Sequence, residues 1–352
     1  MSSCVVLATA ACNPAAPAAS QLDAHAAQID APSRVTPDAI NQDAGAGAII
    51  PVTMVTLANG NEIPTVQVSI GGSAPFTAEL DTGSVGLRVV TGTIADSAWT
   101  IGTTASSVVY GSGVIAAGTI ATANVTIGDL ATTTAIAVED ITAVSCTAAK
   151  PSCPADGVAA ADFRFSATFP AILGVGFRAN ANIASPLVAI GANHQYALAL
   201  PIYGGSAGAI TIDPDATTIA RFAQTRVQLP VDGVGFDDTT VPFCVNALCV
   251  TGLLDTGQPA TQLATSADAD LAKAGVPAGS TTAPAGTGVD IIVDANAATT
   301  WSFVVGSTPT AGVDLIRFDG TAAVSNLGVA PFHIFDMFYD YAAGVIGVAA
   351  KL

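Results

Sequence analysis

Basic residues are scarce in this sequence: ten Lys and Arg stand against 27 Asp and Glu, which gives a net charge of −17. A chain this acidic repels a phosphate backbone, so we expect no nucleic-acid partner. An acidic surface fits a protein that works at low pH, where many of its carboxylates are neutral. Many exported proteins are acidic without that reason, and the charge alone does not separate the two alternatives.

Histidine and aromatic residues are also rare. With three His and no cluster of carboxylates at ligand spacing, we expect no catalytic metal, and no motif calls for a cofactor. Aromatic residues make up 6% of the chain, and Ala, Val, Thr and Gly dominate the rest. This composition favours short strands and tight turns, so we expect a mostly β protein.

Apolar runs long enough to form a membrane helix are missing as well. A long uncharged segment, residues 179–212, is interrupted by Asn, Pro, Gly and His. We therefore expect no membrane-spanning helix in this chain.

Residues 1–48 do not resemble part of a fold. A short apolar run ends at Cys12 and is followed by an Ala- and Pro-rich stretch, which we expect to be a disordered linker. The run resembles the end of a bacterial lipoprotein signal, although a basic start is missing and Thr9 replaces the usual Leu. The resemblance implies export to the periplasm, the outer membrane or the medium, with a lipid anchor at Cys12. The alternative is that Cys12 is not lipidated and has no role in anchoring.

Four further cysteines lie close together in pairs, Cys146 with Cys153 and Cys244 with Cys249. No His lies near them and neither spacing is Cys-x-x-Cys, so two small-loop disulfides are favoured over a metal site. Disulfides indicate an oxidising compartment.

The most informative feature is a repeated motif. Asp81-Thr82-Gly83 and Asp255-Thr256-Gly257 each follow an apolar, β-rich segment. A single copy is typical of a hairpin turn. Two copies indicate two lobes that each contribute one carboxylate to a shared site.

Strand and helix patterns surround these motifs. Strands are expected at 49–57, 65–70, 76–80, 107–110 and 114–127, separated by Gly-rich turns. A helix is expected at 267–274, with Ser266 as its N-cap, and a second short helix at 329–335.

Five landmarks in order make residues 50–352 resemble the pepsin-like family of aspartic proteases. They are Asp81-Thr82-Gly83-Ser84, Tyr110-Gly111-Ser112-Gly113, the apolar-apolar-Gly element at 171–174, Leu254-Asp255-Thr256-Gly257, and the closing run 326–349. The resemblance implies a bilobal fold of two β-barrel-like lobes with a cleft between them. We expect an N-terminal lobe at 49–203 and a C-terminal lobe at 204–352.

The resemblance also implies a function, an aspartic endopeptidase that is a monomer and hydrolyses the peptide bonds of a polypeptide substrate at acid pH. Asp81 and Asp255 are the expected catalytic pair, because two carboxylates in contact share one proton and supply both a base and an acid for hydrolysis by water. The residues expected to support the two loops are Thr82, Gly83, Ser84, Thr256, Gly257 and Gln258. The expected flap over the substrate comprises Tyr110, Gly111, Ser112 and Gly113.

Two positions depart from the family pattern. Gln258 stands where the family usually places Thr or Ser, whose hydroxyl supports the aspartate, and a glutamine amide is a donor that would replace it if the side chain folds back. Arg88 stands where the family usually has the Trp that holds the flap tyrosine, and we expect it near the site and not in a core. The alternative function is therefore an inactive homologue that binds or inhibits a peptide or protein.

Competing motifs are weaker. The segment 204–208 fits Gly-x-Ser-x-Gly but is followed by an extended pattern, so we expect a β connection and no hydrolase elbow. His194 and His333 are single histidines in apolar settings and are expected to be structural.

Overall fold

The structure is a computed structural model, and it describes residues 47–178, 182–229, 233, 235–293, 300–306 and 315–351. The chain divides into two units, residues 1–42 and 43–352, and every described residue lies in the second. The expected linker, with Cys12, lies outside the described residues except for Gly47 and Ala48.

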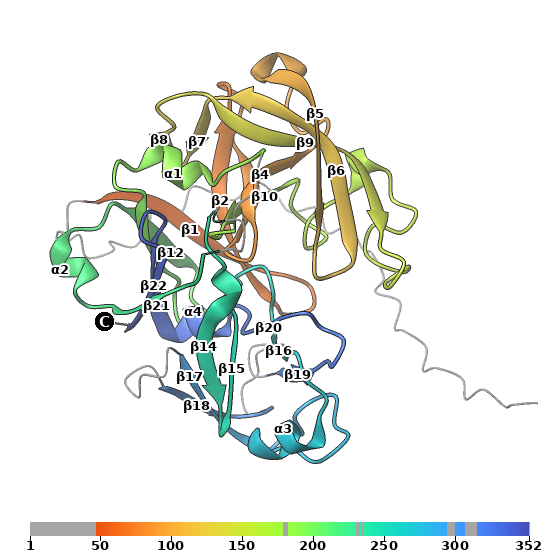
Figure 1. The fold of residues 1–352 in the computed structure, drawn as a ribbon. Coiled ribbons are helices and arrows are strands. Elements are labelled where there is room, and N and C mark those ends of the chain that lie inside the picture. Colours follow the sequence, from red (N-terminus) through yellow and green to blue (C-terminus); the bar gives the residue numbers. More distant parts are fainter. Residues whose placement is uncertain are drawn as a thin grey trace, which may run out of the picture. The chain divides into compact units, whose positions relative to one another are not determined.

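The described chain is mostly β, as the composition predicts, and its strands form two sheets (Figure 1). The larger sheet contains β1 (Ala48–Thr56), β2 (Glu62–Ile70), β3 (Phe76–Asp81), β4 (Val85–Val90), β5 (Thr100–Val109), β6 (Val114–Ala123), β7 (Val125–Ile127), β8 (Leu130–Ala131), β9 (Ile136–Cys146), β10 (Ala171–Val175), β11 (Gln195–Ala199), β12 (Ala207–Ile212), β13 (Ala223–Arg226), β21 (Phe335–Asp340) and β22 (Val345–Ala350). The smaller sheet contains β14 (Val241–Val245), β15 (Leu248–Leu253), β16 (Thr261–Leu263), β17 (Gly288–Val293), β18 (Thr300–Val304), β19 (Ile316–Phe318) and β20 (Ser325–Asn326).

Helices in the described residues are short. They are α1 (Pro186–Ile190), α2 (Ala216–Ile219), α3 (Asp268–Lys273) and α4 (Ala330–Ile334), with 3-10 turns η1 (Asp96–Ala98), η2 (Ala160–Asp162) and η3 (Asp238–Thr240). The two predicted helices are therefore present as α3 and α4. The predicted cap is wrong, because Ala267 occupies the N-cap position of α3 and makes no side-chain hydrogen bond there.

The predicted strands are present with shifted ends. Those at 49–57, 65–70 and 76–80 correspond to β1, β2 and β3, the one at 107–110 is the end of the longer β5, and the one at 114–127 is divided into β6 and β7. Alternation explains β1, where Ile50, Val52 and Met54 point into the core and their neighbours outward. Strands β4 and β10 lie in the middle of the larger sheet and are buried almost throughout.

Strand order does not follow the expected division at residue 203. In the larger sheet, β11 pairs with β12 and with β21, so strands from both expected lobes share one sheet. The smaller sheet is formed by residues between Val241 and Asn326. One large cluster of buried apolar side chains includes residues of both sheets, among them Leu80 and Phe243. The division into lobes at 49–203 and 204–352 remains a prediction.

Both predicted disulfides are confirmed. Cys146 and Cys153 are joined with a Cα–Cα distance of 5.5 Å, and Cys244 and Cys249 are joined directly across the β14–β15 hairpin. Their presence fits an oxidising compartment.

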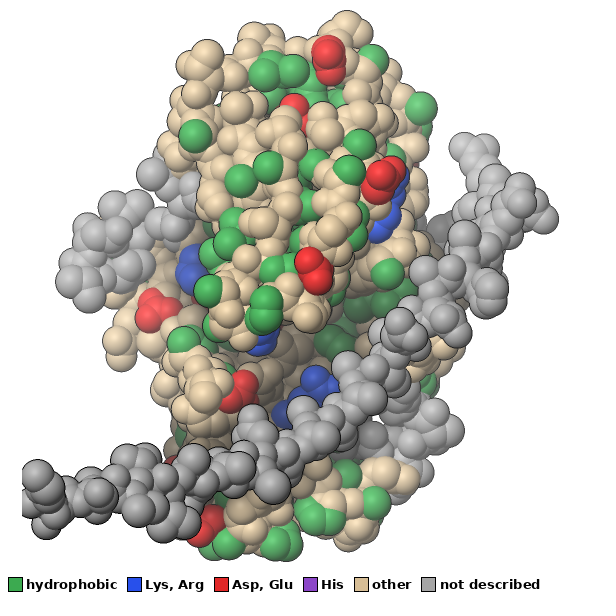
Figure 2. All heavy atoms as spheres, turned by 90° about the vertical axis from the view of Figure 1, so that its right-hand side faces the viewer, with side chains coloured by type: hydrophobic (Ala, Val, Ile, Leu, Met, Phe, Trp, Pro, Cys, Tyr) green, Lys and Arg blue, Asp and Glu red, His purple; other side chains and the backbone are tan. Residues whose placement is uncertain are grey.

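Charged side chains are few and scattered among uncharged ones on the face shown in Figure 2. In the described part of the chain, no helix has the length and apolar character needed to cross a membrane.

Candidate active site

Each Asp-Thr-Gly loop is built on the same strand pattern. The first connects β3 to β4, and β10 lies between these strands, parallel to β3 and antiparallel to β4. The second connects β15 to β16, and β20 lies between them with the same two orientations. The sequence repeat is therefore also a repeat of local structure.

The two loops are bound to each other through their threonines. The backbone N–H of Thr82 donates to Thr256 Oγ1, and the N–H of Thr256 donates to Thr82 Oγ1, both at 3.0 Å. Each hydroxyl then donates to a carbonyl of the opposite strand end, Thr82 to Leu254 at 2.8 Å and Thr256 to Leu80 at 2.6 Å. Because both threonines are buried, these bonds fix one loop relative to the other.

The glycines bring the aspartates together. A Cβ on Gly83 would lie 2.4 Å from Asp255 Cγ, and one on Gly257 would lie 2.8 Å from Asp81 Oδ1. The N–H of Gly83 donates to Asp81 Oδ1 at 2.7 Å, and that of Gly257 donates to Asp255 Oδ1 at 2.8 Å. The loops thus place each carboxylate against the glycine of the other repeat, where no side chain would fit.

The two carboxyl groups interact strongly. Burial raises the pKa of Asp255 well above its usual range, and the charge of Asp81 and a hydrogen bond to Asp81 raise it further. The amide of Asn326 and the N–H of Gly257 act in the opposite direction. The surroundings therefore favour the protonated form of Asp255.

The residues after each glycine do not take the expected roles. Ser84 Oγ is buried and makes no hydrogen bond within the described residues. Gln258 Nε2 donates to the carbonyl of Ala260 at 2.9 Å, so its amide does not fold back to Asp255. The outer oxygen of Asp255 instead accepts from Asn326 Nδ2 at 2.6 Å. Sequence reasoning missed Asn326, although a comparison of the two repeats would have shown an amide where the first has an aliphatic residue.

The expected flap is the tip of the β5–β6 hairpin. A tight turn closes it, with Gly113 N–H donating to the carbonyl of Tyr110 at 2.9 Å, and Lys150 Nζ donates to the carbonyl of Gly111 at 2.6 Å. The Tyr110 ring packs edge-on against Phe165, with ring centres 5.6 Å apart. Burial raises the pKa of Tyr110, the Arg88 charge opposes this, and the Asp81 charge adds to it. Tyr110 is therefore near enough to Asp81 for the charge of that aspartate to affect its pKa.

Arg88 differs from the expectation that it lies outside a core. Its side chain is 1% exposed, Nε pairs with Glu139 at 2.8 Å, and Nη1 donates to the carbonyl of Val85. The expectation of a non-core residue is wrong, because the fully buried Glu139 compensates the charge.

Glu79 is a buried acidic residue on the same strand as Asp81. Glu79 lies on β3, two residues before Asp81. Its carboxyl group accepts a hydrogen bond from Ser166 Oγ at 2.8 Å. Burial raises the pKa of Glu79 to about 8, the Ser166 hydrogen bond lowers it and the Asp81 charge raises it. Glu79 is therefore neutral at acid and neutral pH.

The competing motifs are structural. The Gly-x-Ser-x-Gly segment leads into strand β12, with no helix after the serine. His333 is fully buried, with Nδ1 against the carbonyl of Pro201 at 3.0 Å, and His194 Nδ1 lies 2.9 Å from the carbonyl of Val188. Among the described residues, no group of three or more His, Cys, Asp or Glu is placed to hold a metal ion.

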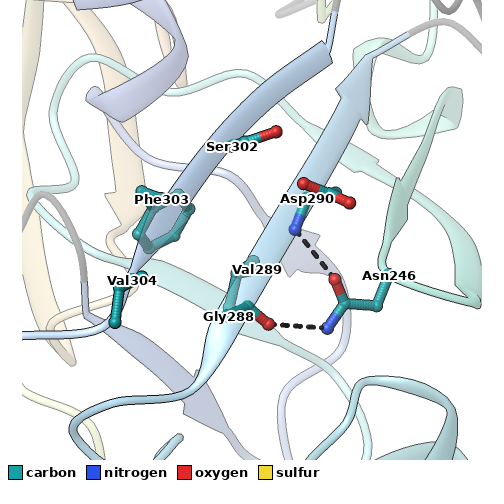
Figure 3. A pocket seen from close by; sticks show the side chains of 7 residues that line it. All are labelled: Asn246, Gly288, Val289, Asp290, Ser302, Phe303 and Val304. Carbon is teal, nitrogen blue, oxygen red and sulfur yellow. Dashed lines mark hydrogen bonds between the residues drawn. The ribbon is translucent and has the colours of Figure 1, made fainter.

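A shallow pocket lies elsewhere, on strands β17 and β18 beside the β14–β15 turn (Figure 3). Asn246 lies beside β17, donating to the carbonyl of Gly288 and accepting from the N–H of Asp290. None of the Asp-Thr-Gly residues lines this pocket.

Comparison of the sequence with known protein families finds no matching family, and comparison with characterised proteins finds no match.

Proposed function

We propose that the protein is an aspartic endopeptidase with a pepsin-like bilobal fold, which hydrolyses peptide bonds at acid pH. One observation carries the proposal: the two Asp-Thr-Gly loops face each other, joined by reciprocal threonine hydrogen bonds, with interacting carboxyl groups. This arrangement supplies a base that deprotonates the attacking water and an acid that protonates the carbonyl oxygen of the substrate.

The roles of the residues follow from their placement. Asp81 and Asp255 share one proton and activate the water. Because they titrate as a pair, we do not assign the role of base to one and the role of acid to the other. The hairpin tip at Tyr110 and Gly111 holds the polypeptide substrate. The disulfides support export, and a lipid anchor at Cys12 and a monomeric state belong to the same proposal.

The test is cleavage of a denatured protein across pH 2 to 8, with and without pepstatin. We expect cleavage at acid pH that pepstatin blocks, and its loss in Asp81→Asn and Asp255→Asn with the circular dichroism spectrum unchanged. Cleavage that survives both substitutions would refute the assignment of the catalytic pair.

A second candidate function, peptide binding without cleavage, is favoured by a different observation. Neither Ser84 nor Gln258 donates a hydrogen bond to an aspartate, so the support expected after each glycine is missing. A protein that binds a peptide without cleaving it is the alternative. It is favoured if the purified protein binds pepstatin but cleaves no unfolded substrate at any pH.

A further inference from the structure

Asn326 makes a contact that neither Asp-Thr-Gly motif predicts. Its Nδ2 donates to Asp255 Oδ2 at 2.6 Å, while its Oδ1 accepts from the N–H of Gly328 at 2.8 Å. The second bond fixes the orientation of the amide, because only the oxygen can accept from a backbone N–H. The NH₂ group must therefore face the carboxylate.

The position of Asn326 has a counterpart in the first repeat. On β20, Asn326 pairs with Leu253, two residues before Asp255. On β10, Ile172 pairs with Glu79, two residues before Asp81. Leu-Gly follows in both strands, so Asn326 occupies the place of an aliphatic residue.

The same repeat also differs in its loop. The first loop continues with Ser84, a short hydroxyl side chain, and the second with Gln258, whose amide is bonded to Ala260. The second repeat therefore has no hydroxyl after its glycine and gains an amide on the neighbouring strand. The amide reaches the oxygen of Asp255 that does not accept from Gly257.

We propose that Asn326 is a positioning residue that holds the outer oxygen of Asp255 as a hydrogen-bond acceptor in every protonation state of the aspartate pair. An amide nitrogen donates and cannot accept, so the bond is strongest while Oδ2 carries no proton, and it favours the charged form of Asp255. This inference deepens the proposed function and rests on it.

The test replaces Asn326 with the residue of the other repeat. Asn326→Ile keeps a strand-forming side chain and removes the donor, and Asn326→Ala is a second variant in case the first does not fold. We expect kcat to fall about tenfold. The Asn326 hydrogen bond lowers the pKa of Asp255 because it stabilises the charged form. Removing this bond should raise that pKa and move the pH profile of kcat to higher pH.

Asn246→Gly is the matched control. Asn246 also has both ends of its amide bonded to backbone, and its φ of 52° is one that glycine adopts readily (Figure 3). This control should lower the melting temperature and leave the pH profile in place. Asn326 variants that lose stability but keep the wild-type pH profile would overturn the inference.

The inference and the proposed function fail separately. If wild-type protein cleaves nothing, the proposed function fails, and the carboxyl carbon of Asp255 is then titrated by NMR with ¹³C-labelled aspartate, its signal identified through Asp255→Asn. A titration midpoint that rises in Asn326→Ile or Asn326→Ala supports the positioning role. An unchanged midpoint overturns it.

Discussion

Thr82 and Thr256 exchange hydrogen bonds, the backbone N–H of each donating to the hydroxyl of the other at 3.0 Å. Thr82→Val and Thr256→Val keep the side-chain shape but leave a buried N–H without its acceptor. We expect each to lower the free energy of unfolding by about 1–3 kcal/mol, measured by urea denaturation. Thr103→Val, at an exposed position of β5, is the control and should change stability little. Equal stability of all three variants would contradict the role of the threonine pair.

Gly83→Ala should lower activity strongly. Its new Cβ would lie 2.4 Å from Asp255 Cγ, so the second aspartate must move away from the first. We expect kcat to fall by about 10² or more, since small misplacement of reacting groups has effects of that size. Gly288→Ala is the control, because a Cβ there meets nothing within 4 Å. The measurement is cleavage of a denatured substrate at acid pH, and full activity of Gly83→Ala would refute the role of this glycine.

Glu79 should make the fold more stable in acid. Its pKa is raised from 4.5 to about 8 in the folded protein, so the folded state keeps a proton that the unfolded state releases. Its contribution to stability is therefore complete below about pH 4.5 and is lost as the pH rises towards 8. Glu79→Gln, which retains an acceptor for Ser166, should flatten the pH dependence of the melting temperature in this range. An identical slope in wild type and variant would contradict the burial of a neutral Glu79.

Lys150 should restrain the hairpin tip. It lies in the loop closed by the Cys146–Cys153 disulfide, and its Nζ donates to the carbonyl of Gly111 at 2.6 Å. In Lys150→Ala we expect faster hydrogen exchange of the amides at 110–113, measured by mass spectrometry. Lys273→Ala, which removes a surface pair with Asp270, should leave that exchange unchanged. Unchanged exchange in Lys150→Ala would show that the turn is held by its own backbone bonds.

Gln258→Thr should change activity little. The sequence alone predicts a gain, because a hydroxyl would restore the missing donor to Asp255. In the structure, Asn326 already donates to the outer oxygen of Asp255, so a new hydroxyl would add only a second donor to an oxygen that is already bonded. A several-fold rise in kcat for Gln258→Thr would show that the Asn326 bond is weaker than its 2.6 Å length indicates.

Local patterns predicted much of the fold. Alternation gave β1, and the short cysteine spacings gave both disulfides, because each depends on residues near one another in the chain. The cap of α3 was missed because Ser266 has the right side chain for an N-cap, yet the helix begins one residue later. The membership of β21 and β22 in the larger sheet depends on long-range pairing, which periodicity does not report.

The candidate site divides in the same way. The paired Asp-Thr-Gly motifs predicted two facing loops, since each copy supplies one carboxylate to a shared site. The donors around them were not predictable from the motifs alone. Gln258 turns to Ala260, and Asn326 reaches Asp255 from a strand 71 residues further along the chain. Arg88 was placed wrongly because its partner Glu139 lies on another strand, β9, 51 residues away.

The larger sheet has a consequence for the order in which the protein folds. Strand β22 pairs with β13 and β21, and β21 pairs with β11, so residues 335–350 complete a layer begun more than a hundred residues earlier. A ribosome releases β13 long before β22, and β11 long before its second partner β21, so these open edges need protection from pairing with other chains until then. Completion of this sheet therefore waits for the synthesis of β22, and a chain that stalls before Val345 would expose β13 as a site for aggregation.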